Sequence, residues 1–364
     1  MYNPLRQLKS RPWLHALLGV GVVLLLAVVT WSRLSHTTYP SSVSQGNSSR
    51  DRYHRRFAVF GTVGDVTLWG QEQRIQKAGE AIMTRLRALH NRINLFDSDS
   101  ELSRLNRKAS RGGFRCSDRM WQLLQVAKRA YEETDGAVDV TVGPLMELWG
   151  FHEEQEEIPE EDKIHQVLKA VGFAQVELDS DGQRVKFQNS DTYVDFGGLA
   201  KGYALDVAVK IARKKGIQRG LINLGGNIAC LSKPPPGQCA YRIGIRDPVH
   251  PDQLLMKIHV TDCFISSSGN YEKSRKIGGR RIGHIVDPRT GEPVQDIAGT
   301  TVVANKGITS DIYSTAVFID GESRAKEFTE RHKNPAGVLL VRRKKGAEES
   351  VVQKIEWQWA DQTQ

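Results

Sequence analysis

A chain of 364 residues can hold one large domain or two ordinary ones, and its 39% hydrophobic and 26% charged residues are the composition of a globular protein. The formal net charge of +9 suits an anionic ligand or an anionic membrane surface. The chain has neither a zinc-finger spacing nor the interleaved aromatic and basic residues of RNA-binding proteins, so we expect no nucleic-acid partner.

An apolar run at 13–31 follows Arg6, Lys9 and Arg11 near the start of the chain. In helical form the run is roughly 28 Å long, close to the hydrocarbon thickness of a bilayer. Basic residues ahead of such a run predict a cytoplasmic N-terminus, here residues 1–12. A cleaved signal peptide is the alternative, but no Ala-x-Ala site follows and the run is long for a signal sequence. We therefore expect a single uncleaved transmembrane anchor, with the rest of the chain outside the cytoplasm.

Residues 32–56 are rich in serine and other polar residues, the composition of a flexible tether, and we expect the folded domain to occupy 57–361. The domain starts with two short strand-like runs around Gly61 and Gly64, followed by an amphipathic helix at 73–94. The apolar positions of this helix recur at spacings of three and four: Ile75, Ala78, Ile82, Leu86, Leu89 and Ile93.

Helices and strands then alternate without a regular βαβ rhythm. Further helices are predicted from Asp118, which we expect to cap its helix, over 160–173 and 199–216, and from about Ser310 and Glu322. Strands are predicted at 220–226, 241–247, 254–260, 300–305 and 337–343. This mixture predicts an α+β fold, with mixed or antiparallel sheets and packed helices in one large domain.

The four cysteines are Cys116, Cys230, Cys239 and Cys263, and they lack the spacing of a metal site. In an oxidising compartment Cys230 and Cys239 can bridge, yet four cysteines allow three pairings. The sequence therefore leaves the disulfide state open.

The stretch DFGGLAKGYALD, at 195–206, places two glycines between an expected strand end and a helix start. Glycines let the backbone approach a ligand closely, and the free amides of a first helical turn favour an anion. The stretch is neither a P-loop nor a dinucleotide-binding fingerprint. A phosphate site and a tight turn with a solvated Lys201 are therefore both open on this stretch alone.

A second stretch, ITSDIYSTAVF at 308–318, favours a metal. In a helix that starts near Ser310, the side chains of Asp311, Ser314 and Thr315 share one face. Carboxylate and hydroxyl oxygens are hard donors, which suit a partly hydrated Mg²⁺ that shares its remaining positions with a ligand's phosphates. The alternative is structural: Ser310 caps the helix and Asp311 offsets its dipole.

Three more stretches carry candidate site residues. DGAVDVTVGPLMELWGF, at 135–151, starts with an Asp-Gly turn and continues into a predicted strand that bears Asp139. NLGGN, at 223–227, brings a glycine pair to a strand end, where a flat ring or a phosphate can approach the backbone. RIGHIVDPRTGEP, at 281–293, sets His284 ahead of an Asp-Pro-Arg-Thr-Gly turn, and alone it is typical of an exposed histidine beside a turn.

Together, and in this order, these stretches resemble the ApbE family of FAD:protein FMN transferases. The matching stretches are GTVGDVTL, FDSDSELSRLNR, DGAVDVTVGPLMELWGF, DFGGLAKGYALD, NLGGN, SSSGNYEKSRKIGGRRIGHIVDPRTGEPV and TSDIYSTA. The resemblance runs from about Phe57 to near the C-terminus and implies an ApbE-like fold with a T-fold-type core. It also implies an enzyme that binds FAD with Mg²⁺, transfers FMN to a threonine or serine of a target flavoprotein and releases AMP.

The resemblance further implies roles for individual residues. His284 matches the family histidine proposed as the base that activates the acceptor hydroxyl. The metal falls on the side chains of Asp311 and Thr315 and on the backbone carbonyl of Gly198. The positions expected to contact FAD are Phe60, Phe96, Ala137, Val138, Asp139, Asp195, Lys201 and Val286. With the N-terminal anchor, the family implies a place at the bacterial inner membrane, facing the periplasm, and acceptors that include membrane redox complexes.

Two positions depart from the family pattern. Phe60 stands where the family usually has Met, and Phe96 where many members have an aromatic hydroxyl. Both positions border the FAD pocket in the family, so the affinity for FAD or the balance of transfer against hydrolysis can differ. The alternative functions are an FAD pyrophosphatase that gives FMN and AMP, and a non-catalytic membrane-tethered FAD-binding protein.

Overall fold

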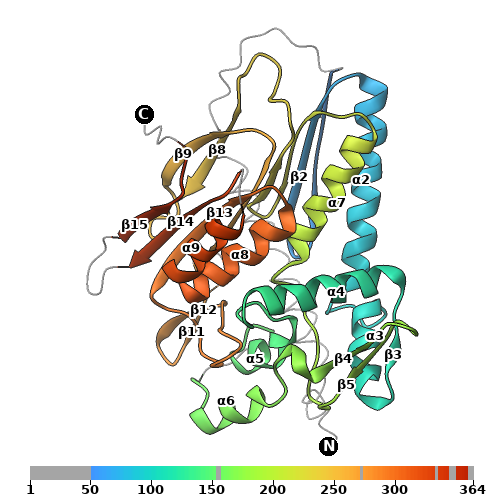
Figure 1. The fold of residues 1–364 in the computed structure, drawn as a ribbon, viewed down its shortest axis with the longest axis vertical. Coiled ribbons are helices and arrows are strands. Elements are labelled where there is room, and N and C mark those ends of the chain that lie inside the picture. Colours follow the sequence, from blue (N-terminus) through green and yellow to red (C-terminus); the bar gives the residue numbers. More distant parts are fainter. Residues whose placement is uncertain (1–50, 153–156, 271–273, 333–334, 344–349, 360–364) are drawn as a thin grey trace, which may run out of the picture. The chain divides into compact units, whose positions relative to one another are not determined.

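An antiparallel sheet of eight strands forms the centre of the fold in the residues that the computed structural model describes, which are 51–152, 157–270, 274–332, 335–343 and 350–359. The strand order is β1-β2-β6-β7-β10-β13-β14-β15, and every neighbouring pair is antiparallel (Figure 1). The strands are β1 (Arg52–Val59), β2 (Thr62–Trp69), β6 (Arg219–Leu224), β7 (Asn227–Cys230), β10 (Cys263–Gly269), β13 (Ile297–Ala304), β14 (Gly337–Arg343) and β15 (Ser350–Ile355). All the described residues belong to one unit, Ser49–Gln364.

Helices cover one face of this sheet. The helices α2 (Glu72–Ile93), α7 (Ala200–Lys214) and α8 (Gly307–Asp320) pack against it, and α9 (Glu322–Arg331) packs beside α8 and β14. The predicted apolar stripe of α2 is confirmed, because all six of its positions are buried: Ile75, Ala78, Ile82, Leu86, Leu89 and Ile93.

A separate two-stranded sheet covers the opposite face. It consists of β8 (Tyr241–Arg246) and β9 (Leu254–Val260), whose apolar side chains share a core with Ile265 and Val303 of the large sheet. Neighbouring residues of β13 therefore face different cores, since Val302 lies in the core on the helix side. This explains why every residue of β13 is buried.

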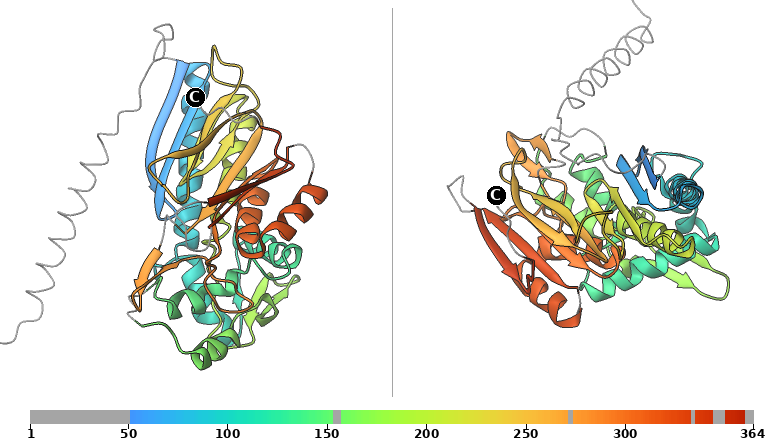
Figure 2. Two further views of the ribbon diagram at one scale, coloured as in Figure 1. Left: turned by 90° about the vertical axis from the view of Figure 1, so that its left-hand side faces the viewer. Right: turned by 90° about the horizontal axis from the view of Figure 1, so that it is seen from above.

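The remaining elements gather at one end of the large sheet (Figure 1). They are the helices α3 (Glu101–Lys108), α4 (Asp118–Glu133), α5 (Gly143–Leu148) and α6 (Glu161–Leu168), and the small sheet of β3 (Phe114–Arg115), β5 (Arg184–Phe187) and β4 (Val176–Asp179). Three short 3₁₀ helices connect them: η3 (Ala109–Arg111), η4 (Val140–Val142) and η5 (Phe173–Gln175). A hairpin of β11 (Ser274–Ile277) and β12 (Arg280–Gly283) stands out from the body of the domain in both views of Figure 2.

The expected α+β class is confirmed, whereas three predicted details outside the candidate site are wrong. The cap of α4 is Ser117 instead of Asp118, since the Ser117 hydroxyl accepts a hydrogen bond from the Met120 amide at 3.4 Å. The helix expected over 160–173 ends at Leu168, and Gly172, with a φ of +115°, turns the chain into η5.

The third detail is the end of the expected tether at 32–56. The strand β1 starts at Arg52, which pairs with Trp69 of β2, and its buried positions are Tyr53, Phe57 and Val59. The last residues of that expected tether are therefore part of the sheet.

The expected anchor at 13–31 lies outside the described residues. Within the described ranges, no helix is both long and apolar enough to cross a bilayer. The four cysteines are all free, so the considered bridge between Cys230 and Cys239 is not formed. Cys230 instead lies opposite Cys263 in the register of β7 and β10.

Candidate active site

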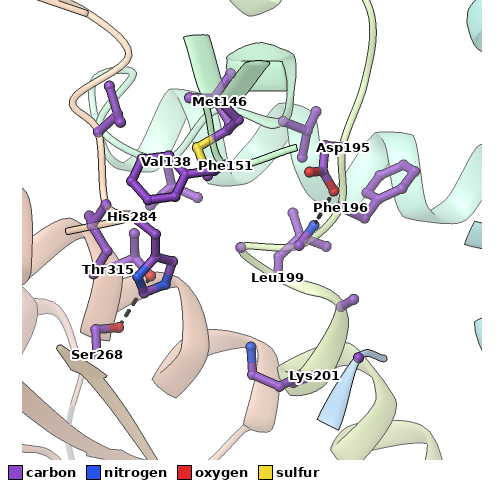
Figure 3. Close-up of a pocket in the computed structure, with 18 of the residues that line it drawn as sticks. Val138, Met146, Phe151, Asp195, Phe196, Leu199, Lys201, Ser268, His284 and Thr315 are labelled. Carbon is purple, nitrogen blue, oxygen red and sulfur yellow. Dashed lines mark hydrogen bonds between the residues drawn. The ribbon is translucent and has the colours of Figure 1, made fainter. Parts of the chain in front are cut away.

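A cavity of about 730 Å³ lies where the large sheet meets the smaller end of the domain (Figure 3). This volume is in the range of small-molecule and cofactor sites. All the predicted site residues line it: Phe60, Phe96, Ala137, Val138, Asp139, Asp195, Gly198, Lys201, His284, Val286, Asp311 and Thr315. The fold thus brings together residues from widely separated parts of the chain, whose individual roles stay predictions.

The helix that carries Asp311 starts at Gly307, earlier than predicted. The carboxylate of Asp206, in α7, accepts hydrogen bonds from the amides of Gly307 and Ile308 at 2.7 and 2.9 Å. Asp206 therefore caps α8 in place of Ser310. Ser310 is buried inside the helix, where its hydroxyl donates to the Gly307 carbonyl at 3.0 Å.

The Asp311 carboxylate is buried and held by two neutral donors. Its Oδ2 accepts from the Gly202 amide and its Oδ1 from Nδ2 of Asn227, both at 2.7 Å. Gly202 has no room for a side chain, because an added Cβ would lie 2.4 Å from the Gly307 carbonyl oxygen and 2.5 Å from Cβ of Asp311. The close contact of α7 with α8 thus fixes the direction of the carboxylate.

The surroundings of Asp311 fit a divalent cation. Its side chain is only 4% exposed, and among the described residues no Lys, Arg or His lies within ion-pair distance of it. Each carboxylate oxygen keeps a lone pair beyond the one that its donor uses. Thr315, one helical turn further, and Gly198 line the same cavity, and such oxygen donors are those that Mg²⁺ prefers. In the described ranges no group of three or more His, Cys, Asp or Glu side chains could hold a metal, so the ion would depend on this smaller set.

A row of hydroxyl groups joins β10 to α8 and β13 beside the cavity. Oγ of Ser268 lies 2.9 Å from Oγ of Ser314. It also lies 3.4 Å from Oγ1 of Thr315, and Figure 3 shows these two residues side by side. Oγ of Ser267 lies 2.9 Å from Oγ1 of Thr301. Ser267 and Ser268 line the cavity and were missed as site residues, although the matching stretch SSSGN contains them.

The glycine loop between Asp195 and Lys201 forms another wall. Oδ1 of Asp195 accepts from the Gly197 amide at 2.8 Å, and its Oδ2 is 3.4 Å from Nε2 of His152. Because α7 starts at Ala200, Lys201 lies in the first helical turn, and no carboxylate of the described residues pairs with its ammonium group. An unpaired cation beside the amides of a helix start suits a phosphate.

Asp139 caps a 3₁₀ helix, so the expected strand at this position is wrong. Its Oδ1 accepts from the amide and the hydroxyl of Thr141, both at 2.8 Å, which turns the chain into η4. Its Oδ2 is buried and has no hydrogen-bond partner among the described residues. Burial raises the pKa of Asp139, against the opposing effect of the hydrogen bonds from Thr141 and of the nearby backbone amide of Phe173. A buried acceptor without a partner at a cavity wall suits a ligand that brings a donor.

His284 comes directly after β12 and before the predicted turn, which is confirmed. The turn closes through a hydrogen bond from the Gly291 amide to the Asp287 carbonyl at 2.8 Å, and Gly291 takes a φ of +77°. The His284 ring meets Phe151 edge-on with ring centroids 6.5 Å apart. Figure 3 draws it on the side of the cavity that holds Thr315.

Two phenylalanines and two histidines complete the lining. Phe96 is 79% exposed and meets His152 edge-on with ring centroids 5.9 Å apart, so its face is free to stack on a planar ligand. Phe60 has a φ of +50°, and its amide donates to Nδ1 of His90 at 3.3 Å. His90 and His152 were missed as site residues, because a lone histidine in a helix or loop gives no signal.

Known proteins share this sequence and this fold. The ApbE family model matches residues 60–340. The chain is 30% identical over 258 residues to the FAD:protein FMN transferase of Escherichia coli K12, covering 69% of this chain and 73% of that protein. An ApbE protein of Thermotoga maritima has a TM-score of 0.75 at 28% identity, over 83% of this chain and 96% of that one. The flavin transferase ApbE of Vibrio cholerae has a TM-score of 0.73 at 26% identity, over 84% and 97%. The chain therefore belongs to the ApbE family of flavin transferases.

Proposed function

We propose that this chain transfers FMN from FAD to the hydroxyl group of a threonine or serine of a target protein, in a Mg²⁺-dependent reaction that releases AMP. One observation carries the proposal: an oxygen donor set around Asp311 and a histidine, His284, line the same cavity. Cleavage of a pyrophosphate requires neutralisation of its negative charge. Attack by a hydroxyl requires a base that takes its proton.

The cavity walls supply groups for each part of the substrate. Asp311, Thr315 and the Gly198 carbonyl would hold Mg²⁺, which neutralises charge on the phosphate oxygens when bound. Lys201 adds a positive charge at the glycine loop, whose amides can donate to the same phosphates. The rings of FAD would contact the side chains of the remaining walls, which are aromatic or apolar except for Asp139, whose Oδ2 can accept a hydrogen bond. These residues are Phe60, Phe96, Ala137, Val138, Asp139 and Val286.

His284 serves as the base in this proposal. It accepts the proton of the acceptor hydroxyl while that oxygen attacks the phosphorus of the FMN half of FAD. The bond between this phosphorus and the bridging oxygen breaks, and AMP leaves with the bridging oxygen. Help of this kind raises a rate by roughly 10²–10⁴-fold. Asp195 orients the glycine loop, because its Oδ1 accepts a hydrogen bond from the Gly197 amide.

The test uses the full-length protein in detergent with FAD, MgCl₂ and an acceptor flavoprotein that carries an unmodified threonine. The intact mass of the acceptor should gain one FMN, with release of AMP, and EDTA should abolish the gain. His284→Ala should still bind FAD and lose transfer, whereas His259→Ala, on an exposed position of β9, should transfer at the wild-type rate. Transfer by His284→Ala at the wild-type rate contradicts the base role. Free FMN with AMP and an unmodified acceptor would indicate the FAD pyrophosphatase instead.

We further infer that a helix at 13–31 tethers the enzyme to the bacterial inner membrane, with the catalytic domain on the outer side. The length of this apolar run and the basic residues ahead of it support the inference. A tether would raise the encounter rate with an acceptor in a membrane redox complex. Protease added to spheroplasts should digest the domain while the protein sediments with the membrane fraction. Recovery in the soluble fraction contradicts the inference.

A further inference from the structure

The hairpin of β11 and β12 concentrates positive charge beside the cavity. Its four basic residues, Arg275, Lys276, Arg280 and Arg281, are called the basic hairpin below. Among the described residues, no carboxylate lies within ion-pair distance of any of them, unlike the arginines of the turn and of α9. These charges are therefore not offset by a carboxylate in the described part of the domain.

The two faces of the hairpin differ. Ile277 and Ile282 are buried in a core cluster with Trp149 and fix the inner face. Lys276 and Arg281 are direct partners in the register of β11 and β12, and as neighbours of these isoleucines they share the outer face. Both are exposed. The outer face thus presents two positive charges directly opposite each other.

This arrangement is unfavourable without a partner. Like charges directly opposite in an antiparallel pair destabilise it. Arg280, beside the turn, is also exposed, but its register partner is Ile277, so it does not lie on the outer face. Arg281 gains only a neutral partner, because its Nε donates to Oγ of Ser274 at 2.7 Å. An anionic group placed between Lys276 and Arg281 would remove the repulsion.

The hairpin is continuous with the candidate active site. Ser274 and Arg275 line the cavity, and β12 leads directly into His284. The hairpin stands out from the body of the domain, so a second protein can reach its outer face (Figure 2). Its turn contacts Ile158, whose Cγ1 would lie 3.0 Å from a Cβ added at Gly278. That contact is apolar and uses none of the four charges.

We propose that the outer face of the basic hairpin binds an acidic segment of the acceptor protein and brings its hydroxyl group toward His284. This inference rests on the proposed function. FAD is not the occupant, since Lys276 and Arg281 do not line the cavity. An acidic polypeptide fits better than an anionic membrane, because the face adjoins the cavity that the acceptor hydroxyl has to enter.

The test measures binding of a fluorescein-labelled peptide, with Glu and Asp on both sides of one threonine, to the full-length protein in detergent. The same peptide with Gln and Asn is the neutral comparison. The variant is Lys276→Glu with Arg281→Glu. The matched control is Arg242→Glu with Lys257→Glu, which changes the net charge equally on the exposed side of β8 and β9. The affinity for FAD is measured in parallel and should stay unchanged in both.

We expect the hairpin variant to bind the acidic peptide about tenfold or more weakly at low salt, and the control variant to change the affinity by less than about twofold. Equal losses in both variants would overturn the proposal, because they would indicate attraction by net charge alone. A second outcome would also overturn the proposal: the wild-type protein binds a soluble short-chain phosphatidylglycerol but not the acidic peptide, and the hairpin variant no longer binds the phosphatidylglycerol. The outer face would then be assigned to a membrane. Peptide binding does not require turnover. If the peptide binds in a way that depends on the hairpin but no FMN is transferred, the result would therefore contradict the proposed function and leave the binding proposal intact.

Discussion

Arg289 connects the turn after His284 to the C-terminal end of the helix that carries Asp311. Its Nε and Nη2 lie 2.9 and 2.8 Å from the two carboxylate oxygens of Asp287, and its Nη2 lies 2.5 Å from Oδ1 of Asp320. The hydrogen bond to Asp287, followed by that to Asp320, raises the pKa of Arg289. The candidate base and the candidate metal ligand are thus fixed relative to each other through an ion pair.

Arg324 extends this connection to a third wall of the cavity. Its side chain is only 6% exposed, and it contacts Oδ2 of Asp320 at 3.0 Å and Oδ2 of Asp135 at 2.9 Å. Asp135 begins the segment that continues to the cavity residues 137–139. Asp320 therefore holds two arginines, and these tie the turn and the 137–139 wall to α8.

We expect Asp320→Asn to lower both stability and turnover. It removes one partner of a buried guanidinium, so the free energy of unfolding should fall by about 2–4 kcal/mol in urea titrations. The kcat of FMN transfer should fall while KM for FAD changes little, because the change alters how the walls are placed and removes no contact with FAD. Asp262→Asn is the control, since it removes an exposed pair with Arg213 and should cost less than about 1 kcal/mol. Equal effects of the two variants would show that Asp320 has no positioning role.

Asn227 orients the Asp311 carboxylate without lining the cavity itself. In Asn227→Ala, Oδ1 of Asp311 loses the donor that it has among the described residues, and the carboxylate can rotate away from the cation. Loss of such an orienting partner typically lowers metal affinity by about 10–100-fold. The Mg²⁺ activation curve should shift by that factor, with transfer close to the wild-type rate at saturating Mg²⁺. An unshifted curve would argue against Asp311 as the metal ligand. Asn189→Ala is the control, because it removes a side-chain hydrogen bond to the Lys169 carbonyl on a residue that does not line the cavity.

Local patterns predicted most of the long elements. The stripe of α2 and the turn at Asp287 were found because each depends on residues close together in the chain. The residue that caps α8 was not predicted, because Asp206 reaches the Gly307 amide only after α7 and α8 have packed together. The short strands β3 to β5 were missed for a similar reason, since two to four residues carry too little periodicity.

The candidate site was predicted through the family resemblance more than through its chemistry. The spacing of Asp311 and Thr315 favoured a metal but left a structural alternative open. The contacts in the fold favour the metal over the structural alternative. Asp206 already caps the helix, and the Asp311 carboxylate accepts hydrogen bonds from neutral donors. The free oxygen of Asp139 was beyond prediction, because a sequence does not show which buried acceptor lacks a donor.

Asp139 should lower the stability of the ligand-free protein. Burial holds its pKa above the ordinary value of 3.8, so the folded state binds this proton more tightly than the unfolded state does. As the pH rises above 3.8, ionisation of Asp139 therefore lowers the free energy of unfolding. This loss of stability reaches its full size once the pH exceeds the pKa of Asp139 in the folded state. Asp139→Asn should therefore raise the free energy of unfolding by about 1–2 kcal/mol at neutral pH. The difference should shrink as the pH falls toward 3.8.

The same substitution should weaken FAD binding, because the amide group no longer offers the free carboxylate oxygen. Urea titrations across this pH range, with FAD affinity from flavin fluorescence, check both parts. Asp191→Asn, at an exposed position, should change neither quantity. A variant that gains stability and keeps its FAD affinity would show that Oδ2 does not contact the ligand.

The four thiols should differ sharply in reactivity. Cys239 is exposed, whereas Cys116, Cys230 and Cys263 are buried. Burial, with a smaller effect of Glu101, raises the pKa of Cys116 to about 12, and burial beside Cys263 raises that of Cys230. Since the thiolate is the reactive form, a disulfide reagent should modify one thiol of the native protein rapidly and all four in guanidinium chloride.

Cys239→Ser should abolish the rapid phase and leave three thiols in the denatured protein. The count in guanidinium chloride decides the redox state that the sequence leaves open. Two thiols instead of four in the denatured wild-type protein would contradict the free state. The missing pair would then be Cys230 and Cys263, because β7 and β10 place these two opposite each other, whereas Cys239 lies on the exposed surface.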